Sequence, residues 1–187
     1  MAEIKQIMLC GFGGQGIVLA GTILGHAGTN DGKWVAGSSA YGVQARGGYT
    51  RTGVVMSDEP INFPHVIKAD VLVAMSQEAY DECIENVERE NGLVIYDEGL
   101  VSIKEISGLR QIGVPATDMA TKELNSRQAA NMVILGAAVE INKIVTKDAL
   151  ISAVEENVSE RFKALNLKGV ELGFKLASSG SRQLGLG

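Results

Sequence analysis

The chain has 187 residues, enough for one domain of ordinary size with a proper hydrophobic core. Hydrophobic residues make up 45% of it and charged residues 21%, which excludes a disordered or fibrous protein. The net charge of −5 argues against a dedicated nucleic-acid-binding protein, and no stretch has the length of a transmembrane helix. Because the first residues do not form a secretory leader, we expect a cytoplasmic protein without nucleic-acid or membrane partners.

The chain contains two cysteines and two histidines. Cys10 ends the first predicted strand and Cys83 lies on a predicted helix, so we expect buried thiols rather than metal ligands or a disulfide. His26 and His65 have no second ligand at metal-binding spacing. We therefore expect that no metal or iron–sulfur centre is held by this chain alone.

The first informative stretch is an apolar run, Ile4–Cys10, followed by a glycine-rich turn at residues 11–16 and an apolar helix. Three of its glycines satisfy the pattern G-x-G-x-x-G in a strand–turn–helix context. Glycine permits a tight turn, and the unpaired N–H groups of the helix N-terminus attract an anion such as a phosphate. The predicted cofactor-binding residues of this glycine turn are Gly11, Gly13, Gly14, Gln15 and Gly16.

A second interpretation of the glycine turn is structural: its glycines allow the helix to pack closely on the sheet. The next predicted strand, Lys33–Gly37, bears on this choice because a nicotinamide-binding unit ends its second strand in Asp or Glu. This chain has Ala36-Gly37-Ser38-Ser39 there instead, so a standard NAD site is not expected.

The second informative stretch, residues 38–49, is expected to be a loop rich in glycine and polar side chains. Its lone arginine, Arg46, suits close contact with a partner backbone or with a phosphate, which a guanidinium binds in bidentate fashion. The alternative is a surface loop whose arginine caps a neighbouring helix. The residues of this stretch predicted at an interface are Tyr41, Gly42, Gln44, Gly47 and Gly48.

The rest of the chain alternates between predicted strands and helices. Strands are expected at residues 49–57, 70–76, 93–97 and 109–114. Helices are expected at residues 77–89, 119–124, 126–142 and 146–157, with a last one from 159, and with caps at Ser76 and Thr146. This order predicts an α/β fold, a three-layer α/β/α domain with a mainly parallel, Rossmann-like sheet. We expect a single domain over residues 1–177 and a flexible tail at 178–187.

Two further polar residues are candidates for a functional role. Asp97 and Glu98 end a predicted strand, but no partner base is evident, and a structural role is the better interpretation. Asn131 lies beside the apolar face of a helix, where its amide either reaches a partner subunit or satisfies backbone groups within the fold. The 11–16 turn, the 38–48 loop and Asp97 are expected together at the carboxyl ends of the strands.

Several of these motifs together resemble the gamma subunit of 2-oxoacid:ferredoxin oxidoreductases, especially the 2-oxoglutarate enzymes. The resemblance covers residues 4–175, and one departure is Gln44, where the family often has an acidic residue. The segments that carry it are Gly11-Phe-Gly-Gly-Gln-Gly16, Ala40-Tyr-Gly-Val-Gln-Ala-Arg-Gly-Gly48, Ser57-Asp-Glu-Pro-Ile61, Val114-Pro-Ala-Thr117 and Asn131-Met-Val-Ile-Leu-Gly-Ala137.

The resemblance implies a non-catalytic subunit of an enzyme that decarboxylates a 2-oxoacid on thiamine diphosphate, passes electrons through iron–sulfur clusters to ferredoxin, and releases an acyl-CoA. It implies alpha and beta partner subunits and, where the enzyme has one, a delta subunit, with the glycine turn and residues 41–48 near the entry of CoA. Two alternatives stay open: a pyruvate or indolepyruvate member of the same family, and a freestanding nucleotide-binding regulatory domain.

Overall fold

The computed structural model describes residues 4–41 and 48–180. The glycine turn, the predicted strands and the predicted caps fall within these ranges. Gly42, Gln44, Arg46 and Gly47 lie outside them. The elements in chain order are β1 (Ile4–Phe12), α1 (Ile17–Asn30), β2 (Trp34–Tyr41), β3 (Tyr49–Ser57), β4 (Val71–Ala74), α2 (Gln77–Cys83), the 3-10 helix η1 (Ile84–Asn86), β5 (Leu93–Asp97), β6 (Arg110–Val114), α3 (Ala116–Leu124), the 3-10 helix η2 (Arg127–Ala129), α4 (Ala130–Asn142), α5 (Lys147–Asn157) and α6 (Glu160–Gly180).

The strands form one six-stranded sheet in the order β2-β3-β1-β4-β5-β6. The pairs β1–β4, β4–β5 and β5–β6 are parallel, whereas β3 is antiparallel to both of its neighbours. All strands except β3 therefore run in the same direction, and the predicted α/β fold with a mainly parallel sheet is confirmed. The departure from a simple alternation of strands and helices is β3, which is inserted between β2 and β1.

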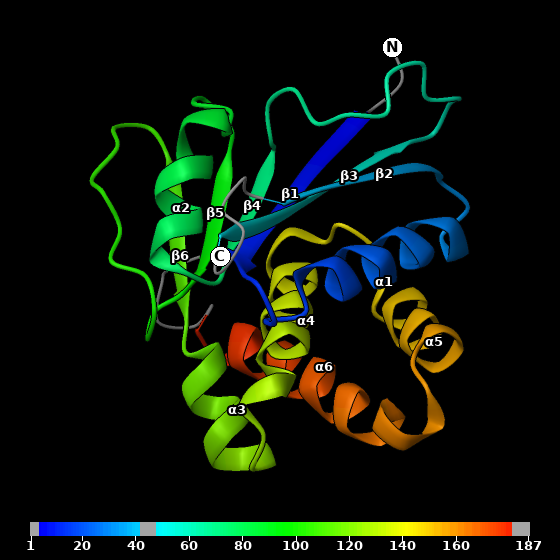
Figure 1. The fold of residues 1–187 in the computed structure, drawn as a ribbon. Helices are drawn as coiled ribbons and strands as arrows, with labels where there is room; N and C mark the ends of the chain where they lie inside the picture. The colour runs from blue at the N-terminus through cyan, green and yellow to red at the C-terminus, as the bar shows by residue number, and fades with distance from the viewer. Residues whose placement is uncertain (1–3, 42–47, 181–187) are drawn as a thin grey trace.

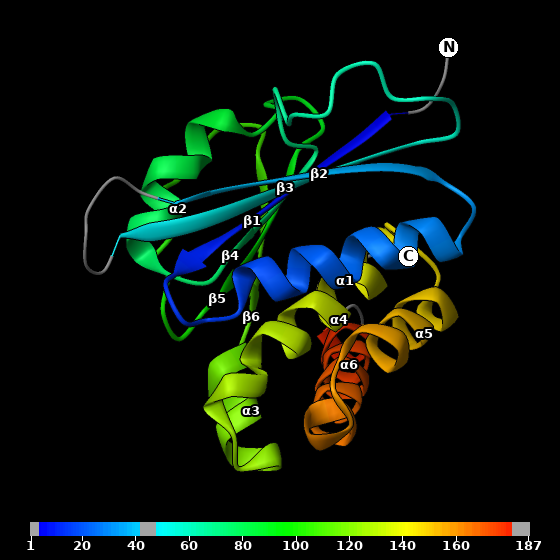
Figure 2. The ribbon, with the colours of Figure 1, turned by 45° about the vertical axis from the view of Figure 1, so that its right-hand side comes forward.

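Helices cover the two faces of the sheet unequally (Figures 1 and 2). Helices α1, α4, α5 and α6 lie on one face, whose core includes Ile7, Leu9 and Ile95. Helix α2 lies on the other face, over a smaller core that includes Met8 and Tyr80. Because successive residues of a strand point to opposite faces, β1 contributes alternately to both cores. The result is three layers: a thick layer that contains α1, α4, α5 and α6, the sheet, and a thin layer that contains α2.

The prediction of a loop from residue 38 was wrong for its first residues, which belong to strand β2. Ser38 pairs with Gly53, and Tyr41 pairs with Thr50 of β3. Cross-strand pairing overrides the weak strand preference of small polar residues, which an edge strand tolerates because one side of it is open. Gly48 precedes β3 directly.

Two predicted helices are shorter than expected, and two are longer. Helix α3 begins at Ala116, three residues before the predicted start at residue 119. Helix α2 ends at Cys83, and after η1 the chain becomes extended because Val87 forms a bridge with Ala69 beside β4. The helix predicted at 126–142 is divided into η2 and α4. Helix α6 extends to Gly180, three residues into the segment predicted as a tail.

Helix α4 is the buried centre of the thick layer, with every residue from Ala130 to Val139 buried. It packs on α6 at backbone distance, because a Cβ at Gly136 would overlap the Val170 carbonyl oxygen. Close contact between helix backbones is what glycine at such a crossing permits. The packing fixes the N-terminal end of α4, where Asn131 lies below the glycine turn.

Candidate functional site

The glycine turn joins β1 to α1 and is tied to the neighbouring strand by one side chain. The Phe12 N–H donates to Gln15 Oε1 at 2.6 Å, and Gln15 Nε2 donates to the Met75 carbonyl at 2.8 Å. Gln15 therefore links the turn to the segment that follows β4. Its amide is used for this link within the chain.

The glycines of the turn divide into an inner and an outer pair. Gly11 and Gly16 face inward: a Cβ at Gly11 would meet Gln15 Oε1 at 2.6 Å, and one at Gly16 would overlap the Asn131 amide. Gly14 has nothing within 4 Å of its Cβ position, and Gly13 is exposed as well. The inner pair serves packing, and the outer pair leaves backbone without side chains on the exposed side of the turn.

Asn131 supports the turn from below. Its Nδ2 donates to the Gly16 carbonyl at 3.2 Å, and its side chain is buried, at 4% exposure. Of the two roles considered for this residue, its contacts match the one within the fold, because the amide faces the turn of its own chain rather than the surface.

Helix α1 begins directly after this turn, and no side chain accepts a hydrogen bond from the N–H groups of its first turn. Gly16, its N-cap, has φ 73° and supplies no side chain, so no side chain caps the first turn. Gly14 has φ 91°, also in the left-handed region. Uncapped N–H groups at the positive end of a 14-residue helix favour an anion.

A cleft of about 470 Å³ opens beside the turn, at the carboxyl ends of the strands. After β1 the chain passes to one face of the sheet as α1, and after β4 it passes to the other face as α2 (Figure 2). Such a divergence is where open α/β sheets bind ligands. The cleft is lined by Phe12, Gly13, Gly14, Gln15, Met75, Ser76, Gln77, Leu100, Thr117, Arg127, Gln128 and Ala130.

Among the lining residues that the structure describes, Arg127 carries the one formal charge. It is exposed and comes from η2, directly before α4. Sequence reasoning missed Arg127 and the neighbouring Gln77 and Gln128, since no motif marks them. The fold brings them to the turn across more than 60 residues of sequence.

Part of the second predicted stretch also approaches the turn. The Gly48 carbonyl oxygen lies 3.9 Å from the Cβ position of Gly13, and Phe12 pairs with Tyr49. Gly48 therefore lies beside the turn, whereas Arg46 is outside the described residues.

Known proteins resemble this chain over nearly its whole length. A family model described as pyruvate ferredoxin/flavodoxin oxidoreductase matches residues 6–176. The chain belongs to this family. The 2-oxoglutarate synthase subunit KorC of Methanocaldococcus jannaschii is 41% identical over 176 residues, covering 92% of this chain and 94% of that protein.

A solved structure and a longer protein are also similar to this chain. The keto/oxoacid ferredoxin oxidoreductase gamma subunit from Geobacter sulfurreducens superposes with a TM-score of 0.83 at 32% identity, covering 94% of this chain and 99% of that one. The ketoisovalerate oxidoreductase subunit VorA of Methanothermobacter marburgensis is 36% identical over 90% of this chain but only 35% of its own length. The predicted resemblance to oxidoreductase gamma subunits is confirmed.

Asp97 proves to be an anchor of the cleft in this family member. Its Oδ2 accepts from the Thr117 N–H at 3.0 Å and from Thr117 Oγ1 at 2.5 Å, and its Oδ1 accepts from the Gly99 N–H at 3.3 Å. Burial raises the pKa of Asp97, and these hydrogen bonds counteract part of that rise. The carboxylate thus holds the start of α3 and the loop after β5 together.

The cysteines are buried free thiols, as expected from the sequence. Cys10 and Cys83 lie against each other between β1 and α2, and the hydrogen bond that the Cys10 thiol donates to Cys83, together with burial, raises the pKa of Cys10 well above its usual value. Within residues 4–41 and 48–180, no three His, Cys, Asp or Glu side chains are placed to hold a metal ion. In the same ranges, no helix combines the length and the apolar character needed to cross a bilayer.

Proposed function

We propose that the chain is the gamma subunit of a cytoplasmic, multi-subunit oxidoreductase whose substrate is 2-oxoglutarate. The support for this substrate is the 41% identity with a 2-oxoglutarate synthase subunit over nearly the full length of both chains. Pyruvate and indolepyruvate are the alternative substrates. The test is activity of the complex, reconstituted with its alpha and beta subunits, on a panel of 2-oxoacids: highest kcat/KM with 2-oxoglutarate supports the proposal, and a preference for another acid refutes it.

In this proposal the redox chemistry belongs to the partner subunits. Thiamine diphosphate supplies decarboxylation of the 2-oxoacid, iron–sulfur clusters carry electrons to ferredoxin, and CoA accepts the acyl group. The residues described in this chain fit a different task, because the cleft offers bare backbone and one cation rather than metal ligands.

We further propose that the cleft binds a phosphate group of CoA. The observation that carries this proposal is that the glycine turn leading into the uncapped N-terminus of α1 lines the same cleft as Arg127. Backbone N–H groups at a helix start bind phosphate, and a guanidinium adds charge-assisted hydrogen bonds. Gly13 and Gly14 let the phosphate approach the backbone, since neither places a side chain in its path. Arg46, which lies outside the described residues, is proposed as a second contact.

The experiment is Arg127→Gln in the assembled complex. Removing one charged partner of a phosphate weakens binding by about tenfold, so KM for CoA should rise about tenfold while KM for 2-oxoglutarate stays unchanged. The matched control is Arg110→Gln, which removes an exposed arginine of strand β6 outside the cleft. An Arg127→Gln complex with the wild-type KM for CoA would rule out the phosphate site.

A freestanding nucleotide-binding domain is the second candidate function, because the same cleft would accept a nucleotide phosphate. The two candidate functions differ in whether the chain binds partner subunits. Co-purification of the tagged chain with thiamine-binding and ferredoxin-like subunits supports the oxidoreductase, and recovery of the chain alone with a bound nucleotide supports the regulatory domain.

A further inference from the structure

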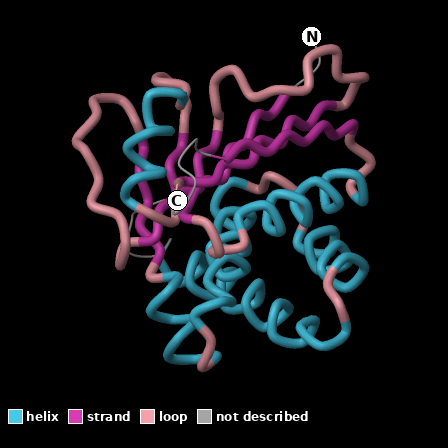
Figure 3. The backbone as a smooth tube through the Cα atoms, in the orientation of Figure 1, coloured by secondary structure: helices cyan, strands magenta, loops and turns pink. Residues whose placement is uncertain are grey.

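The loop that follows β5, residues 98–109, is an irregular segment that we call the strap. It has no helix or strand of its own and runs alongside α2 before entering β6 (Figures 1 and 3). Long irregular segments in compact domains are often functional. Side chains of α2 and β6 hold the backbone of the strap in place.

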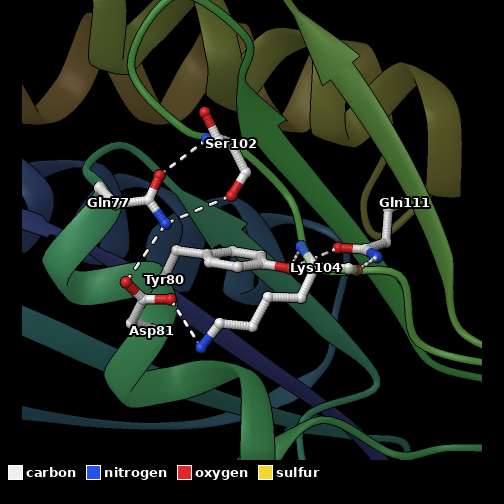
Figure 4. A network of polar contacts seen from close by, with 6 residues as sticks. All are labelled: Gln77, Tyr80, Asp81, Ser102, Lys104 and Gln111. Carbon is white, nitrogen blue, oxygen red and sulfur yellow. Dashed lines mark hydrogen bonds and ion pairs between the residues drawn. The ribbon is translucent and has the colours of Figure 1, made fainter.

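The inner anchor of the strap is a buried hydroxyl. Tyr80 of α2 is fully buried, and its hydroxyl donates to Gln111 Oε1 at 2.8 Å while accepting from the Lys104 N–H at 3.0 Å (Figure 4). Gln111 Nε2 in turn donates to the Lys104 carbonyl at 2.7 Å. Both main-chain polar groups of Lys104 are therefore satisfied by side chains of α2 and β6.

The outer anchor repeats this arrangement two residues earlier. Gln77 Oε1 accepts from the Ser102 N–H at 2.7 Å, and its Nε2 donates to the Ser102 carbonyl at 3.3 Å. Asp81 accepts a further bond from Gln77 and forms an ion pair with Lys104 at 2.8 Å (Figure 4). One amide side chain thus replaces the backbone partner that a neighbouring strand would provide.

The anchors connect the strap directly to the cleft. Gln77, which holds Ser102, also lines the cleft, and so does Leu100 of the strap itself. At the start of the strap, the Gly99 N–H donates to Asp97, whose other oxygen holds Thr117 on the cleft wall. Leu100 therefore sits between two fixed points, Gly99 and Ser102.

We infer that the strap is a fixed wall of the cleft and that Tyr80 is a positioning residue, which controls how tightly the cleft holds its phosphate-bearing ligand without touching it. This inference rests on the proposed function, since it takes CoA as the ligand. Loss of the Tyr80 hydroxyl leaves the Lys104 N–H without its partner and frees the middle of the strap. The Leu100 and Val101 N–H groups keep their bonds to the Asp97 carbonyl, so the part of the cleft wall that loosens is Ser102 together with the Gln77 amide that holds it.

The test is Tyr80→Phe, which removes the hydroxyl and keeps the buried ring. In the full chain, hydrogen exchange of residues 102–104 should accelerate by about threefold to tenfold, the equivalent of one neutral hydrogen bond. In the assembled complex, KM for CoA should rise by a similar factor while kcat stays within about twofold. Gln111→Met, which removes the same anchor from the β6 side, should reproduce both effects.

The matched control is Arg161→Gln. Arg161 is exposed near the start of α6, on the opposite face of the sheet from α2, and it does not line the cleft. This variant should change neither the exchange of residues 102–104 nor KM for CoA.

Faster exchange with an unchanged KM in both anchor variants would show that the strap is only structural and would overturn the inference. Unchanged exchange would overturn it as well, because the hydroxyl would then not hold the strap. Failure of the proposed function is recognised separately: Arg127→Gln would leave KM for CoA unchanged even though Tyr80→Phe accelerates exchange.

Discussion

Two cavities at opposite ends of the sheet differ in how they use charge. The cleft at the glycine turn, of about 470 Å³, has bare backbone, an uncapped helix start and Arg127. The cavity at the other end is larger, about 520 Å³, and its lining includes Lys5, Lys33, Lys143 and Lys147 together with three carboxylates. By size and charge alone, the lysine-lined cavity is the more conspicuous one.

The charges of the lysine-lined cavity are mostly used within the chain. Lys143 and Lys147 both pair with Glu140, at 2.7 and 2.9 Å. Lys33 pairs with Asp58, and Asp31 accepts from the Thr146 N–H and hydroxyl, which closes the start of α5. The start of α1 has no such cap. Unpaired hydrogen-bond donors therefore mark the candidate site better than the number of charges does.

The largest effect on stability should come from Gly16→Ala. The left-handed backbone costs about 1–2 kcal/mol for a residue with a Cβ, and here that Cβ also overlaps the Asn131 amide. We expect a loss of at least about 2 kcal/mol in the free energy of unfolding, measured by urea denaturation. Gly14→Ala is the control: it has the same kind of backbone strain but open space, so it should lose only about 1 kcal/mol. Equal losses would refute the inner–outer division of the turn.

Glu140→Gln tests the opposite cavity. Partial burial opposes ionisation of Glu140, but Lys143, Lys147 and Ser178 donate hydrogen bonds and lower its pKa to about 2. A depressed pKa contributes stability above the unfolded value of 4.5, and this contribution is lost as the pH falls toward about 2. We expect the variant to lose about 1 kcal/mol at pH 7, because solvent screens the exposed lysines, and to match the wild type near pH 2. A difference that persists undiminished in acid would contradict this account.

The smallest effect should come from an exposed ion pair outside both cavities. Arg89→Gln removes the pair with Glu85, whose side chains are 41% and 74% exposed. We expect a loss of about 0.5 kcal/mol at low salt and none in 1 M NaCl, measured by urea denaturation. A loss as large as that of Glu140→Gln would show that solvent exposure does not determine how much these two ion pairs contribute to stability.

What the sequence predicted was local, and what it missed depended on distant contacts. The first strand, its glycine turn and the caps at Ser76 and Thr146 were predicted because their signals lie within a few residues, and both caps accept the expected N–H bonds. The extension of β2 to Tyr41 was missed because β3 imposes it. Nothing local marks the hydrogen bond from Asn131 to Gly16, which spans 115 positions.

The candidate site was predicted in part for the same reason. The glycine turn follows from a motif, whereas the strap and Arg127 reach the cleft only through the packing of α2, β6 and α4. A polar residue such as Gln77 has no local feature that distinguishes it from a solvent-exposed helix residue. Its role emerges only when Ser102 lies beside it.

The most direct test of the central claim is 2-oxoglutarate-dependent, CoA-dependent reduction of ferredoxin, measured for the full chain alone, for the partner subunits alone, and for the two combined. The account predicts turnover only for the combination, because the chain supplies a cleft and an interface while its partners supply the redox centres. Turnover by the purified chain alone, or undiminished turnover by the partners without it, would contradict the account.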